Sequence, residues 1–156
     1  ILLKKKLIKL GIKKIKIIDG DFLRKKFNNF NYKNSDRDKV GDLKISIAKK
    51  FYKKNYIVLV SGVAHNNKWR LKIKNQNKDY FEIYVKCSLK TCIERDYKGH
   101  YMKAKSGYIK DFIGVTEPYQ LGNTKDLIIN TSRLSTSMSV RKVLNFLKKI
   151  KYVYKK

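Results

Sequence analysis

The feature that most constrains the fold is a continuous apolar run, YIVLV, at residues 56–60. A run of this kind, bounded by polar turns and preceded by a helix, is typical of a parallel β-strand covered on both faces. The preceding segment, 36–54, repeats apolar residues at helical spacing behind Ser35, a residue type that favours the N-cap position. The expected inward stripe of this helix consists of Val40, Leu43, Ile47, Ala48 and Phe51.

The alternation of helix and strand recurs along the chain. Further strands are expected at 14–19, 80–86 and 127–130, and further helices at 2–10, 22–27, 67–75, 88–95 and 137–150. The first helix places its leucines on one face and has Gly11 at the position of a C-cap glycine. The sequence therefore predicts one α/β domain, residues 1–156, with a parallel sheet between two helical layers.

A sheet of this type binds its ligand beyond the carboxyl ends of the strands. The segments that follow the strands are 19–21 (DGD), 61–67 (SGVAHNN), 95–119 and the loop after Asn130. The segment 95–119 mixes lysines and tyrosines with Gly99, Gly107 and Gly114, without the periodicity of a buried element. One interpretation is a solvated loop. Cations, flat aromatic rings and conformationally permissive glycines together favour a second interpretation. In it, the segment closes over a ligand that carries both a phosphate group and a nucleobase.

The formal net charge of +27 does not by itself indicate a nucleic-acid-binding protein. Lysines are spread through almost every segment beside abundant Asn, Ile and Tyr, as in a general compositional bias, whereas a dedicated site would form one stripe. We therefore expect nonspecific nucleic-acid binding at low salt and no specific nucleic-acid partner.

The sequence also limits the compartment and the metal chemistry. No apolar run reaches the roughly 18 residues of a membrane-spanning helix, and lysines interrupt the opening segment too often for a signal peptide, so we expect a soluble cytoplasmic protein with no membrane partner. Cys87 and Cys92 lack a CxxC spacing and are expected to be reduced thiols, at least one of them in the core. The two histidines have no clustered acidic partner, so a histidine-ligated metal is not expected.

The segments after the strands, read in order, resemble the adenylylsulfate kinase family, whose members phosphorylate the 3′-hydroxyl of adenosine 5′-phosphosulfate with ATP. FEIYVKCSLKTCIERDYKGHYMKAKSGYIKDFIGVTEPY at 81–119 resembles the strand, helix, lid and substrate clamp of the family in unbroken order. IIDGDFLR at 17–24 and SDRD at 35–38 support the resemblance, which covers about residues 10–150. It implies a three-layer P-loop kinase fold, with Mg2+ as cofactor and ATP as co-substrate.

The resemblance implies a role for each of these segments. Residues from about 95 to 119 would form a lid, in which Lys103 offsets charge on the transferring phosphoryl group and Arg95 and Lys98 contact ATP. Asp21 would orient or deprotonate the attacking hydroxyl, although Asp19 and Asp21 could instead only cap the following helix. The substrate-binding positions that the resemblance implies are Asp19, Arg24, Tyr32, Arg37, Val63, Ala64, Phe112 and Gly114.

For four of these positions the resemblance implies a contact with a particular part of the substrate. Arg24 and Arg37 would hold the phosphosulfate group, although Arg37 could also be a solvated arginine of a first helical turn. Phe112 would stack on the substrate's base, with Tyr32 on its second side.

The chain departs from the family pattern at several of the substrate contacts. Lys39 and Val40 occupy positions where the family has an acidic residue and an asparagine, and VAHNN at 63–67 replaces Ile-Ser-Pro-Tyr-Arg. Ala64 therefore lacks the hydroxyl and Asn67 lacks the cation found there. Lost polar contacts of this kind can change discrimination between substrates by orders of magnitude, so the departures bear on the identity of the acceptor.

The phosphate-binding loop of the family is absent from the printed sequence. No GxxxxGK[ST] occurs, and Gly11 and Gly20 are isolated glycines. Because the chain opens at Ile1, inside the helix that should follow that loop, we expect an amino-terminal truncation of roughly 20 residues, comprising the central first strand and the loop. The strands at 56–61 and 80–86 would then face each other across an unfilled slot or collapse together, and these 156 residues alone should lack kinase activity.

The function expected from the sequence is ATP-dependent phosphorylation of adenosine 5′-phosphosulfate in sulfate assimilation. Two alternatives stay open: a kinase for another nucleotide conjugate, such as cytidine diphosphoramidate in capsule modification, and a degenerate, noncatalytic nucleotide-binding domain. The partner expected in each case is a small nucleotide, and a homodimer is the assembly we consider.

Overall fold

Helices and strands alternate along the chain, as the sequence predicts. The computed structural model describes residues 1–27, 33–123 and 125–152. Its elements are α1 (Leu2–Lys9), β1 (Ile15–Asp19), α2 (Gly20–Lys26), α3 (Asn34–Tyr52), β2 (Ile57–Ser61), α4 (Asn67–Gln76), β3 (Ile83–Lys86), α5 (Leu89–Arg95), α6 (His100–Lys105), β4 (Leu127–Asn130) and α7 (Thr136–Lys149). Each predicted element is present with bounds shifted by a few residues, while α6 lies in a segment where the sequence predicts no regular structure.

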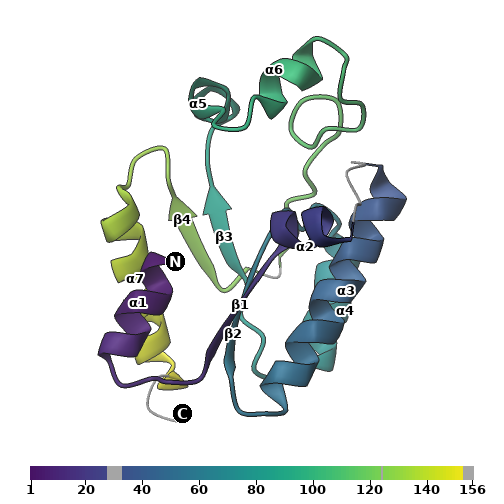
Figure 1. The fold of residues 1–156 in the computed structure, drawn as a ribbon. Helices are drawn as coiled ribbons and strands as arrows, with labels where there is room; N and C mark the ends of the chain where they lie inside the picture. The colour runs from purple at the N-terminus through teal and green to yellow at the C-terminus, as the bar shows by residue number, and fades with distance from the viewer. Residues whose placement is uncertain (28–32, 124, 153–156) are drawn as a thin grey trace.

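The strands pair in parallel and lie between two layers of helices, which confirms the predicted three-layer α/β architecture. β1 pairs with β2, with Ile15 opposite Ile57, and β3 pairs with β4. α1 and α7 lie on one side of the strands, and α3 and α4 lie on the other (Figure 1). The principal core is formed where α1 and α7 meet the strands, and its buried members are Leu7, Ile12, Ile15, Ile57, Ile129, Val143 and Leu147.

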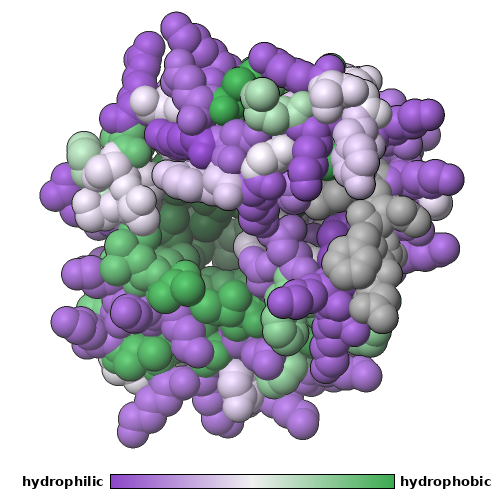
Figure 2. All heavy atoms as spheres, turned by 45° about the horizontal axis from the view of Figure 1, so that its top comes forward, coloured by the Kyte–Doolittle hydropathy of each residue, from purple (hydrophilic) through white to green (hydrophobic). Residues whose placement is uncertain are grey.

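β2 and β3 do not pair with each other, because they belong to two separate two-stranded sheets. Both strands line a cavity of about 670 Å³, together with side chains of α3, α4 and α7. Figure 2 shows this hollow with hydrophobic residues along its walls. Of the two arrangements predicted for these strands, the separated one is therefore confirmed.

The start and the inward face of α3 differ from the prediction. The helix begins at Asn34, and the backbone oxygen of Lys33 accepts the first N–H groups, so Ser35 lies within the helix and does not cap it. Of the predicted stripe, Val40 is buried and the other members are half-buried, because part of this face borders the hollow. A residue that the pattern does not select, Lys44, is buried instead.

α4 packs closely against α3 at a glycine. A side-chain carbon on Gly41 would lie 2.8 Å from the indole ring of Trp69, so the ring occupies the space that a larger residue would need. The indole Nε1 also donates a hydrogen bond to Asp42 at 3.4 Å. This contact positions the loop that precedes α4, which is part of the candidate site.

Two further expectations concern the cysteines and the membrane. Both thiols are free, as predicted, but neither Cys87 nor Cys92 is fully buried, because both border the open hollow; the prediction of a core thiol is wrong. Within residues 1–27, 33–123 and 125–152, no helix has the length and apolar character needed to cross a bilayer.

Candidate active site

The segments singled out from the sequence meet at the carboxyl ends of the strands. α2 follows β1 directly, the loop 62–66 leads from β2 into α4, and α5 follows β3. In Figure 1, α2, α5 and α6 all lie at the end of the molecule toward which the strands point. The segments that the sequence analysis singled out therefore lie together beyond the strand ends.

Asp19 caps helix α2. Its Oδ1 accepts hydrogen bonds from the backbone N–H groups of Asp21 at 3.0 Å and Phe22 at 3.1 Å, and its Oδ2 accepts one from the hydroxyl of Ser61 at 2.8 Å. Partial burial opposes ionisation, but the hydrogen bonds from Ser61 and the two N–H groups outweigh it and lower the pKa of the Asp19 carboxyl. Asp19 therefore has the helix-capping role that the sequence analysis gave as the alternative for Asp19 and Asp21. Its carboxylate also joins the end of β1 to the end of β2.

Asp21 has a different environment, although it lies two residues away. Its carboxylate forms an ion pair with the ammonium of Lys98, which lies between α5 and α6. Both side chains are more than half exposed, so the pair adds little to stability in water. The contact nevertheless brings the 95–119 segment onto the start of α2, beside the carboxylate that the sequence singles out as a base.

The other two basic residues assigned to the lid lie elsewhere. Arg95 donates to the backbone oxygen of Thr131 at 2.9 Å and lies 3.9 Å from the sulfur of Cys87, so it joins the exits of β3 and β4. Lys103 is exposed on α6, with its Nζ 5.9 Å from the ring centroid of Tyr108. The lid cation that contacts Asp21 in this structure is therefore Lys98.

α6 is held by Asp96, a residue that the sequence analysis did not select. Its two carboxylate oxygens accept the backbone N–H groups of Tyr101 at 3.1 Å and Met102 at 3.0 Å. Gly99, which adopts a left-handed conformation with φ of 65°, allows the chain to turn between the carboxylate and these groups. An aspartate before a left-handed glycine is the signal that could have indicated a helix here.

The segment 112–120, which contains the substrate clamp that the resemblance implies, is called the clamp segment below. It begins at Phe112, which lies among aromatic residues of α6. Its ring meets that of Tyr101 edge-on at 5.1 Å and that of His100 at 6.3 Å. The preceding residue, Asp111, offers its backbone oxygen to the guanidinium of Arg37 on α3. Arg37 and Phe112, assigned to different parts of one substrate, are therefore brought to neighbouring positions.

The loop after β2 is tied to the end of the clamp by a buried arginine. Arg70 is only 2% exposed, and its guanidinium donates to the backbone oxygens of Ala64 and Gln120. It also lies 3.4 Å from a carboxylate oxygen of Glu82 and 5.3 Å from the ring centroid of Tyr119. The backbone N–H of Gln120 in turn donates to the backbone oxygen of His65 at 3.2 Å. Arg70 thus fixes the loop that carries Ala64.

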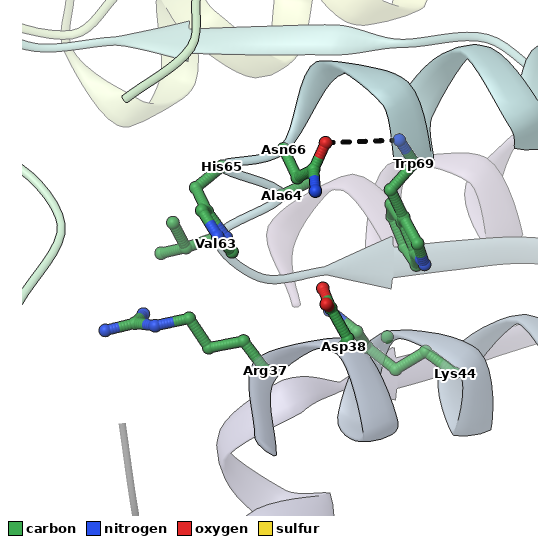
Figure 3. Close-up of a pocket in the computed structure, with 9 residues that line it drawn as sticks. Arg37, Asp38, Lys44, Val63, Ala64, His65, Asn66 and Trp69 are labelled. Carbon is green, nitrogen blue, oxygen red and sulfur yellow. Dashed lines mark hydrogen bonds between the residues drawn. The ribbon is translucent and has the colours of Figure 1, made fainter. Parts of the chain in front are cut away.

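A small pocket lies between α3 and this loop. Asp38 and Lys44 lie on the side of the helix that faces the loop, with Val63, Ala64, His65 and Asn66 opposite, and Arg37 extends sideways from the helix (Figure 3). Partial burial and the charge of Arg37 lower the pKa of His65, which favours the neutral imidazole. Asn66 caps α4 by accepting the N–H of Lys68 at 2.9 Å.

The remaining predicted positions have mixed placements. Arg24 is half-buried on α2, Val63 is exposed in the loop, and Gly114 is exposed with a left-handed φ of 91°. Tyr32 lies outside the described residues. The structure adds Lys44, Arg70 and Asp96, whose importance depends on burial and on contacts between distant segments.

Comparison with known proteins gives a consistent result. A family model described as "Adenylylsulphate kinase" matches residues 1–130. The adenylyl-sulfate kinase of Clostridium kluyveri is 32% identical over 133 residues, which are 84% of this chain and 67% of that protein. A probable adenylyl-sulfate kinase of Synechocystis is 33% identical over 153 residues, 97% of this chain and 85% of that protein.

A solved structure agrees with the sequence comparison. The APS kinase CysC of Mycobacterium tuberculosis, in complex with AMPPNP and APS, superposes with a TM-score of 0.85 at 28% identity, covering 94% of this chain and 87% of that one. Several curated relatives are longer: this chain spans 65% of the adenylyl-sulfate kinase of Geotalea uraniireducens, to which it is 31% identical over 85% of its own length. From the family match over most of the chain and the shared fold, we conclude that this chain belongs to the adenylylsulphate kinase family.

Proposed function

We propose that the protein transfers the γ-phosphoryl group of ATP to the 3′-hydroxyl of adenosine 5′-phosphosulfate. The observation that carries this proposal is the position of Asp21: a carboxylate at the strand ends, not used as a helix cap, in contact with a lysine of the lid segment. Phosphoryl transfer depends mainly on positioning and on offsetting negative charge, and a carboxylate beside a basic segment supplies both requirements.

Each of the candidate residues would have its own role in this phosphoryl transfer. Asp21 would accept the proton of the attacking hydroxyl once Lys98 turns from it toward phosphate oxygens. Arg24 and Arg37 would bind the phosphosulfate, with Arg37 placed by the backbone oxygen of Asp111. Phe112 would stack on the adenine beside its aromatic neighbours.

Mg2+ fits a site of this kind. Kinases hold this ion through one or two carboxylates and the substrate's phosphates, without a protein cage. No cluster of three or more His, Cys, Asp or Glu side chains occurs among the residues that the structure describes, whereas the exposed carboxylate of Asp21 can supply one oxygen. When bound, Mg2+ would neutralise charge on the phosphates.

Phosphorylation by the complete protein tests this proposal directly. We expect ATP-dependent conversion of adenosine 5′-phosphosulfate, and no comparable conversion of cytidine diphosphoramidate. The relatives named above, which are adenylyl-sulfate kinases, support the first acceptor. Equal or preferred use of the cytidine compound would reassign the acceptor, and no turnover of any nucleotide conjugate would favour a noncatalytic domain. The purified 156-residue chain, assayed in parallel, is expected to be inactive.

Phe112→Ala is expected to weaken acceptor binding. Removal of an aromatic stacking surface costs about 1–3 kcal/mol per base, roughly a 5- to 150-fold higher dissociation constant. Calorimetric titration of the complete protein with adenosine 5′-phosphosulfate measures this change. Tyr108→Ala is a matched control, because Tyr108 is an exposed ring in the same segment. Unchanged affinity in Phe112→Ala would reject the stacking role.

We also propose a cytoplasmic location and a homodimer for the complete protein. Light scattering of the purified protein tests the second point, since a homodimer doubles the mass of the protomer.

A further inference from the structure

Lys44 is a buried lysine at the point where β1 and β2 end. Its side chain is 6% exposed, although lysines are rarely buried without a partner. The ammonium lies against two glycines that follow the strands: a side-chain carbon on Gly62 would be 2.5 Å from Nζ, and one on Gly20 would be 3.7 Å away. Lys44 therefore reaches from α3 to the edge where Asp19 and Asp21 lie.

The ammonium of Lys44 has no hydrogen-bond or ion-pair partner among the residues that the structure describes. The stem of Lys44 is buried, while its ammonium borders open space and is not among the fully buried atoms that lack a partner. An ammonium placed in this way, without a protein partner, is suited to hold an anion. Lys44 borders both the small pocket beside Ala64 and the large hollow beside β2 and β3. An anion in the small pocket can reach it.

We propose that the ammonium of Lys44 binds a phosphate-type oxyanion of a nucleotide substrate, and so forms an anion-binding contact at the ends of β1 and β2. One part of this inference rests on the proposed function, namely that the bound oxyanion belongs to a substrate nucleotide. The oxyanion belongs either to the phosphate chain of ATP or to the phosphosulfate of the acceptor, and both present tetrahedral oxygens.

The charges around Lys44 are consistent with this role. Burial and the nearby guanidinium of Arg24 lower its pKa, while the carboxylates of Asp19 and Asp21 act in the opposite direction. Those two carboxylates are already engaged, Asp19 by Ser61 and the cap of α2, and Asp21 by Lys98. A bound oxyanion would place a negative charge beside the ammonium of Lys44 and would favour the charged form of the lysine.

The competing explanation is that Lys44 only fills space. Its long side chain occupies the volume beside Gly62, which has no side chain of its own. In that case a neutral residue of the same length would replace it without loss of any ligand. The two explanations therefore differ in one measurable quantity, the affinity for an oxyanion.

The test compares Lys44→Met with Lys50→Met in the complete protein. Methionine keeps most of the length of lysine and removes the charge, and Lys50 is an exposed lysine on the same helix. Calorimetric titrations with inorganic pyrophosphate and with adenosine 5′-phosphosulfate are made at moderate salt, because 39 Lys and Arg residues attract polyanions nonspecifically at low salt. We expect Lys44→Met to raise the dissociation constant for one of these ligands at least tenfold and Lys50→Met to leave both unchanged.

The ligand that loses affinity identifies the source of the oxyanion. A loss for pyrophosphate assigns Lys44 to the ATP side, and a loss for adenosine 5′-phosphosulfate assigns it to the acceptor side. Unchanged affinity for both in Lys44→Met overturns the proposal. The kinase assay is independent of this result: anion binding that depends on Lys44 in a protein without kinase activity would support the contact and reject the proposed function.

An NMR measurement on the wild-type protein tests the proposal even if the Lys44→Met variant does not fold. In protein labelled with 15N-lysine, the Nζ resonance of Lys44 should shift on addition of pyrophosphate or of adenosine 5′-phosphosulfate, while that of Lys50 stays in place. No shift with either ligand would overturn the proposal without any substitution.

Discussion

Asp21→Asn should lower the turnover of the complete protein by about 10²–10⁴-fold, the usual contribution of a general base. Asparagine has nearly the same shape as aspartate but cannot accept the proton of the attacking hydroxyl. Because Asp21 does not cap α2 and its ion pair with Lys98 is exposed, the substitution should leave the fold intact. The effect should therefore fall on turnover, with a much smaller change in KM for the acceptor.

Steady-state kinetics with adenosine 5′-phosphosulfate measure this split. Glu94→Gln is the matched control, because Glu94 is an exposed carboxylate of α5, near the lid segment. We expect wild-type kinetics from it. Normal turnover in Asp21→Asn would eliminate Asp21 as the base.

Arg70→Met should destabilise the protein by about 3–5 kcal/mol, the cost of removing one member of a buried charged network. The substitution leaves the carboxylate of Glu82, at 11% side-chain exposure, without the guanidinium that lies 3.4 Å away. It also removes the donors to the backbone oxygens of Ala64 and Gln120, so the loop after β2 separates from the clamp segment. For a chain of this length, we expect the melting temperature to fall by about 6–20 °C.

Urea denaturation of both proteins measures the difference in the free energy of unfolding. Lys72→Met is the control, since Lys72 is an exposed cation on the same helix and its replacement should change stability by less than about 0.5 kcal/mol. If Arg70→Met were as stable as Lys72→Met, the guanidinium would not hold the loop and the clamp together.

The sequence predicted the elements because their signals are local. The apolar run at 56–60 and the glycine after α1 depend only on neighbouring residues, and both β2 and the left-handed Gly11 are present in the structure. The start of α3 was wrong because Ser35 and Lys33 both precede the apolar stripe, and only the observed backbone shows which of the two closes the first turn.

In the candidate site, too, some features could be predicted from the sequence and others only from the structure. Motif order selected Asp21, Arg37 and Phe112, but it did not distinguish Asp19 as the cap from Asp21 as the free-standing carboxylate, since both follow a strand. That distinction depends on the direction of each side chain, which is set by the turn into α2.

What the sequence determined by itself is the succession of helices and strands, the parallel arrangement and the segments at the strand ends, since hydrophobic period and turn residues act over short distances. Only the tertiary structure decided which charges are buried and which residues meet. Arg70 and Lys44 look like ordinary solvated cations on amphipathic helices, yet one contacts segments about 50 residues away and the other lies against the exits of two strands. The reason is that burial and pairing of a charge depend on elements brought together by folding, and no local pattern in the chain records them.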